Sequence, residues 1–191
     1  MMSNVLVRPF AYLSIQHDSS LPAWVNWGIP MILAGLACAL FTWIGFGAGL
    51  VSDNGFFARV LGFTQGLAGF YIAALAAIAT FSNADMDQLM PGNPPTLVIH
   101  HNSGKETIRL SRRRFLSQLF AYLTALSFVI SLVSIMALAV GVNVKTIFNP
   151  AYVNLAKIVF LFFYFLFLSQ MTTITLWGIY YLGERIHTPD S

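Results

Sequence analysis

Four long stretches of the chain contain no charged residue, and each is long enough to cross a membrane as a helix. They are residues 19–52, 60–84, 115–144 and 158–183. A transmembrane helix needs about 20 apolar residues to span a hydrocarbon core of about 30 Å. Only 9% of the residues are charged and 57% are hydrophobic, against about 25% and about 45–50% in soluble domains. The sequence therefore predicts a four-pass membrane protein and excludes a soluble enzyme, a disordered tail and a nucleic-acid binder.

The predicted fold is all-α, a four-helix transmembrane bundle that forms a single membrane domain over residues 1–191. Its helices are expected at about 28–50, 57–81, 112–141 and 153–182. Residues 21–27 are expected to lead into the first helix at headgroup level, because their two tryptophans favour the membrane interface.

The positions of the basic residues predict the orientation of the bundle. Seven of the ten lie on the side of the two termini and the central loop 82–111, and three lie in the two opposite loops. Short loops rich in Lys and Arg stay in the cytoplasm. We therefore expect both termini and the central loop to face the cytoplasm.

The central loop contains two runs of strand-forming residues, 96–100 and 106–110, around an Asn-Ser-Gly turn. This pattern predicts a short cytoplasmic β-hairpin. A lone hairpin is only marginally stable in water. We expect it to lie against the membrane surface, a neighbouring subunit or a partner protein.

No Asp, Glu, Lys, Arg or His falls within the four uncharged stretches that are expected to lie at membrane depth. Proton-coupled carriers need such groups to bind and release protons, and metalloenzymes need several His or carboxylate ligands. His100 and His101 are adjacent in a predicted strand and point to opposite faces, so one ion cannot be bound by both. We predict a protein that is not an enzyme, with no catalytic residue, cofactor or metal.

The polar residues within the predicted spans are neutral, and they include three glutamines: Gln65, Gln118 and Gln170. Their simplest interpretation is hydrogen bonding between helices. The alternative is a polar pathway for an ion or a small solute, which predicts a small channel or passive transport subunit.

Helix 57–81 carries small residues at helical spacing, among them Gly62, Gly66 and Gly69. Gly62 and Gly66 form a GxxxG step, which lets two helix backbones approach closely. The pattern predicts packing within the bundle or between subunits, and we expect a homo-oligomer.

The charges of the central loop are the candidate contacts with a partner or with lipid. Three consecutive arginines at the start of helix 112–141 suggest an anchor to anionic lipid, worth about 1 kcal/mol per residue, or a docking surface for an acidic cytosolic partner. Asp85 and Asp87 are expected to cap the end of helix 57–81 or to pair with these arginines. The full set is Asp85, Asp87, Lys105, Arg109, Arg112, Arg113 and Arg114.

Three short segments carry a resemblance to known proteins. They are the small-residue run 66–76 (GLAGFYIAALA), the basic helix entry 110–116 (LSRRRFL) and the aromatic exit 177–182 (WGIYYL). With the four-pass layout, they resemble membrane subunits of bacterial anti-phage defence systems, of the Kiwa membrane component or RexB-like phage-exclusion type. The resemblance implies a membrane-embedded sensor or effector that acts through its cytoplasmic loop and a cytosolic effector protein.

Overall fold

The computed structural model describes residues 7–45, 49–52, 54–80, 84–90, 93–101, 104–140 and 150–185. It contains four helices that are long and apolar enough to cross a membrane: Leu21–Ile44, Phe56–Thr80, Arg112–Val140 and Val153–Gly183. The predicted fold class is confirmed, and the chain is a multi-pass membrane protein.

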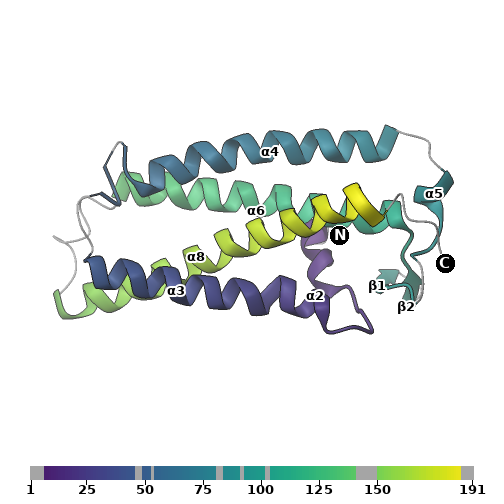
Figure 1. Ribbon diagram of the computed structural model, residues 1–191, viewed down its shortest axis with the longest axis horizontal. Helices are drawn as coiled ribbons and strands as arrows, with labels where there is room; N and C mark the ends of the chain where they lie inside the picture. Colours follow the sequence, from purple (N-terminus) through teal and green to yellow (C-terminus); the bar gives the residue numbers. More distant parts are fainter. Residues whose placement is uncertain are drawn as a thin grey trace.

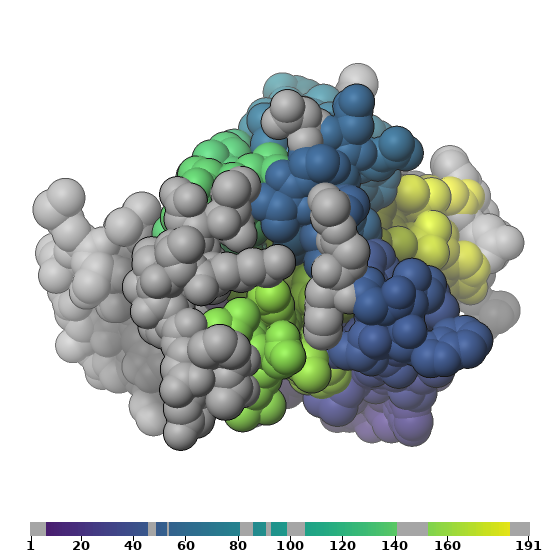
Figure 2. Space-filling view, turned by 90° about the vertical axis from the view of Figure 1, so that its left-hand side faces the viewer, coloured from purple at the N-terminus to yellow at the C-terminus, as the bar shows by residue number. Residues whose placement is uncertain are grey.

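The bundle consists of two antiparallel helix pairs. Helix α4 (Phe56–Thr80) packs along α6 (Arg112–Val140), and α3 (Ile29–Ile44) packs along α8 (Pro150–Tyr180). Seen end-on, α4 and α6 occupy the upper part of the molecule and α3 and α8 the lower part (Figure 2). Helix α8 runs obliquely and lies beside α3 where it begins and beside α6 where it ends (Figure 1).

The first span begins and ends earlier than the predicted 28–50. It begins at Leu21 as α2 (Leu21–Ala23), passes through a π-helical turn η2 (Trp24–Gly28) and continues as α3. Pro22 occupies the first turn of α2, where its missing N–H costs no helical hydrogen bond. The span ends before Gly45, whose φ of 88° suits glycine and interrupts the helix. The segment 21–27 is therefore part of the helix and not a separate lead-in.

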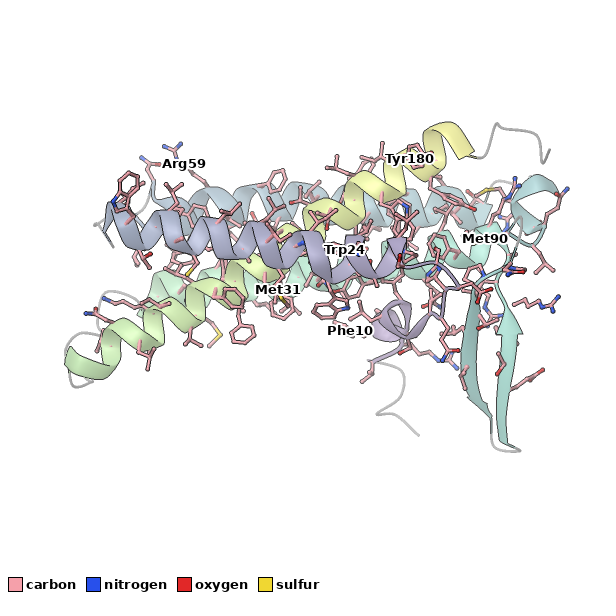
Figure 3. All side chains as sticks on the ribbon, turned by 60° about the horizontal axis from the view of Figure 1, so that its bottom comes forward. Phe10, Trp24, Met31, Arg59, Met90 and Tyr180 are labelled. Atoms are coloured by element: carbon pink, nitrogen blue, oxygen red, sulfur yellow. The ribbon has the colours of Figure 1, made fainter. Side chains whose placement is uncertain are left out.

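One end of the bundle carries the hairpin and two of the short helices that the structure describes outside the four spans, and we call it the cap end. It consists of the 3₁₀ helix η1 (Arg8–Ser14), the short helix α5 (Ala84–Asp87) and the strands β1 (Thr96–His101) and β2 (Gly104–Arg109). The strands pair antiparallel, with Thr96 opposite Arg109, which confirms the predicted hairpin. They run across the long axis of the bundle, and Arg59 marks the opposite end (Figure 3).

The tightest part of the core lies in the first turns of α6, near the cap end. Phe115, Leu116, Leu119 and Phe120 are fully buried there. Helix α8 comes close to this surface at Gly178, where an added Cβ would lie 3.0 Å from Leu119 Cδ2. The lack of a side chain at this glycine therefore permits the close contact between α8 and α6.

Candidate functional site

Arg113 connects three helices at the cap end. Its Nε donates to Asp87 Oδ1 at 2.6 Å and its Nη2 donates to Asp87 Oδ2 at 3.3 Å, while Nη1 donates to the Ile78 carbonyl at 2.5 Å. That carbonyl is among the last four of α4, which have no partner inside the helix. A cation at this position is also favoured by the helix dipole. One side chain on α6 thus holds the end of α4 and helix α5.

The three consecutive arginines have three different environments, because successive helical residues point about 100° apart. Arg112 is buried with only 4% of its surface exposed, and its backbone N–H donates to the Gln88 carbonyl at 3.1 Å. Arg113 forms an ion pair with Asp87. Pairing with these arginines is one of the two arrangements expected for the acidic residues. Only Arg114 points outward among the three. The arginines therefore do not form one continuous contact surface.

The remaining charged residues of the set lie around the hairpin. Arg109 is exposed at the end of β2, directly before α6 begins. Asp85 lies in α5 and Lys105 in β2, but their side chains lie outside the described part of the structure. Arg109 and Arg114, on either side of the junction between β2 and α6, are the described basic residues of this set that remain open to a partner.

The segment before the first span is built into the cap end. Gln16 and Thr96 exchange backbone hydrogen bonds of 2.9 and 3.0 Å, which adds the segment to the free edge of β1. His17 lies against two aromatic rings, with centroid distances of 6.0 Å to Phe115 and 6.3 Å to Trp177. Burial lowers the pKa of the His17 imidazole below its usual value. The hairpin is thus tied both to the chain before the first span and, through Leu110 and α6, to the bundle.

A chain of polar contacts joins this segment to the spans, and the sequence did not reveal it. The Tyr12 hydroxyl donates to Asn26 Oδ1 at 3.0 Å, and Gln170 Nε2 donates to the Asn26 carbonyl at 2.8 Å. The Tyr122 hydroxyl completes the chain by donating to Gln170 Oε1 at 2.6 Å. Asn26 lies in the π-helical turn, where the regular i+4 hydrogen-bond ladder is interrupted. The only signal in the sequence is a lone asparagine between two tryptophans.

The three glutamines lie on three different helices and differ in their exposure to the surroundings. Gln170 is fully buried and both ends of its amide are hydrogen-bonded. Gln65 is exposed on α4, and Gln118 is half-buried on α6, with an Oε1 that has no partner among the described residues. The bonding of Gln170 fits the interpretation as an interhelical contact.

The glycines of α4 face outward. Gly62, Gly66 and Gly69 are exposed, and a Cβ added to any of them would meet nothing within 4 Å. They therefore do not pack against the described part of this chain, and the face that they form is open.

The described residues contain no group of three or more His, Cys, Asp or Glu side chains that could bind a metal ion. Compared with models of protein families, with curated proteins and with solved structures, the chain matches none.

Proposed function

We propose that this chain is a non-enzymatic sensor or effector subunit of a bacterial anti-phage defence system in the inner membrane. In this proposal it couples the membrane bundle to a cytosolic partner. The observation that supports it best is the position of Arg113, which connects α4, α5 and α6 at the cap end. A partner that moves the cap would act on two membrane helices through this single side chain. The anti-phage role rests on the resemblance of the three segments described above.

The surface proposed for the partner is the junction between β2 and α6. Arg109 and Arg114 are both exposed there and are only five positions apart. Exposed guanidinium groups form paired hydrogen bonds with carboxylates, so an acidic partner surface fits them. The orientation inferred from the basic residues places this surface in the cytoplasm.

We also propose that copies of the chain associate through α4. Gly66 is the centre of an open small-residue face, which permits close approach of a second helix backbone. Gln65 lies next to it, is exposed, and forms no hydrogen bond among the described residues. An amide that faces hydrocarbon without a partner is unfavourable, and the same residue of a second copy would satisfy it.

The role in defence is tested by a charge reversal at the open surface. Arg109→Glu combined with Arg114→Glu should abolish protection in a phage plaque assay and the co-purification of the cytosolic partner, while the amount in the membrane stays unchanged. Arg59→Glu at the opposite end is the matched control and should protect like the wild type. Full protection by the double variant would refute the proposed surface.

Self-association is tested by a bulky residue on the open face. Gly66→Leu should reduce cross-linked dimers in membranes at least fivefold, whereas Gly35→Leu, at an equally open glycine on α3, should not. If neither variant changes the cross-linking, α4 is not the interface.

An ion flux through liposomes that is lost with Gln170→Leu would favour the channel alternative instead.

A further inference from the structure

An apolar groove lies between α6 and α8 in the part of the bundle away from the cap end. It has a volume of about 180 Å³. The two helices separate toward the end where α8 begins (Figure 1). Short side chains of α6 face large rings of α8 across this gap. The lining includes Val129 and Val133 on α6 and Phe160, Phe163, Tyr164 and Phe167 on α8.

The groove offers nothing to a polar ligand. The hydroxyl of Tyr164, the one polar side-chain group of the lining residues named above, is hydrogen-bonded at 2.7 Å to the Ser134 hydroxyl in the interior of the bundle. Phe160, Phe163 and Phe167 remain 41%, 51% and 37% exposed within a membrane-spanning helix. An apolar cavity of about 150 Å³ suffices to bind benzene, so the groove is large enough for a segment of hydrocarbon.

A basic residue lies at the outer end of this groove. Lys157 is half-buried, and it precedes Phe160 by one helical turn on the same face of α8. From Lys157 to Phe167 the helix rises about 15 Å at 1.5 Å per residue, which is half of a hydrocarbon core of about 30 Å. The lysine stem can follow the apolar surface while its ammonium group reaches the headgroup level. The groove residues from Phe160 to Phe167 cover about 10 Å of that rise, and the positive charge of Lys157 lies one helical turn beyond them.

We propose that the groove binds one acyl chain of an anionic glycerophospholipid whose phosphate pairs with Lys157. A second copy of the chain fits this face poorly, because the exposed phenylalanine rings hold a helix backbone at a distance. The glycine face of α4, in contrast, lets a second helix backbone approach closely. The bound lipid would fill the gap where α6 and α8 separate and so stabilise their arrangement.

Native mass spectrometry of the full chain in detergent, with added phosphatidylglycerol, tests this proposal. The wild type should retain one phosphatidylglycerol per chain. Val129→Trp, which fills the groove, should reduce this occupancy at least fivefold, whereas Leu132→Trp on the lipid-facing side of α6 should not. Lys157→Glu should reduce it similarly, and Lys157→Arg should preserve it. Equal occupancy in all variants would mean non-specific annular lipid and would overturn the proposal.

A second measurement covers the case in which the groove-filling variant does not fold. A phosphatidylglycerol with a photoreactive acyl chain, added to the wild-type protein, should label the segments 129–133 and 160–167. Labelling spread evenly over all lipid-exposed helix faces would reject a specific site.

Discussion

Gln170 is the side chain whose removal should disturb the bundle most specifically. It is fully buried, its Nε2 donates to the Asn26 carbonyl and its Oε1 accepts from the Tyr122 hydroxyl. Hydrogen bonds between membrane helices contribute about 0.6–2 kcal/mol each. A buried polar group left without a partner costs about 1–3 kcal/mol. Gln170→Leu removes both hydrogen bonds and leaves the Asn26 carbonyl and the Tyr122 hydroxyl without these partners. We therefore expect the free energy of unfolding to fall by about 2–4 kcal/mol.

The measurement is denaturant unfolding in detergent micelles, followed by the loss of helical circular dichroism. Thr172→Val is the matched control: Thr172 is an exposed threonine of the same helix, and within the described residues its hydroxyl bonds only to the Leu168 carbonyl of that helix. We expect this variant to lie within about 0.5 kcal/mol of the wild type. Equal stability of the Gln170 and Thr172 variants would refute the buried contact.

A double-mutant cycle separates the hydrogen bond from general packing. Tyr122→Phe alone leaves Gln170 Oε1 without its donor, whereas the combination with Gln170→Leu leaves no stranded group at that contact. We therefore expect the cost of the double variant to be about 1 kcal/mol smaller than the sum of the single costs. Strict additivity would show that the two side chains do not interact.

Three further expectations concern the cap end and the close contact between α8 and α6. Arg113→Ala should lower the free energy of unfolding by about 1–2 kcal/mol, since it removes a partly exposed ion pair and a bond to a helix end; Arg114→Ala should change it by less than about 0.5 kcal/mol. Burial lowers the pKa of His17, so the folded protein favours the neutral imidazole. The stability of the folded state that depends on this neutral form is fully present above the unfolded pKa of about 6.5 and decreases as the pH falls below it. Melting temperatures between pH 7.5 and 5.5 should therefore decrease less in His17→Phe than in the wild type. Gly178→Leu should lower the free energy of unfolding by about 1–3 kcal/mol, because the new side chain overpacks the contact with α6. Gly66→Leu should leave the melting temperature of the detergent-solubilised monomer unchanged. Equal effects of the two variants would contradict the close contact between α8 and α6 at Gly178.

The sequence by itself determined the four spans and the hairpin. Span length and apolarity follow from the thickness of the hydrocarbon core, a property of the solvent that every transmembrane helix must match. The hairpin followed from local turn chemistry at residues 102–104, which needs no distant partner. The sequence predicts too late a start for the first span, because the segment 21–27 has the composition of a headgroup-level segment. Its continuation of the helix depends on packing: Thr173 donates to the Val25 carbonyl and Gln170 to that of Asn26.

Only the tertiary structure decided which polar and small residues face one another. Three arginines that are equal in the sequence become a buried, a paired and an exposed side chain, because a helix turns each by about 100° toward different neighbours. Likewise, the close approach of α8 to α6 uses Gly178, whereas the glycines of α4 face outward. Helical spacing specifies a shared face but not what covers it, because that depends on contacts between residues distant in the chain, such as Gln170 with Asn26.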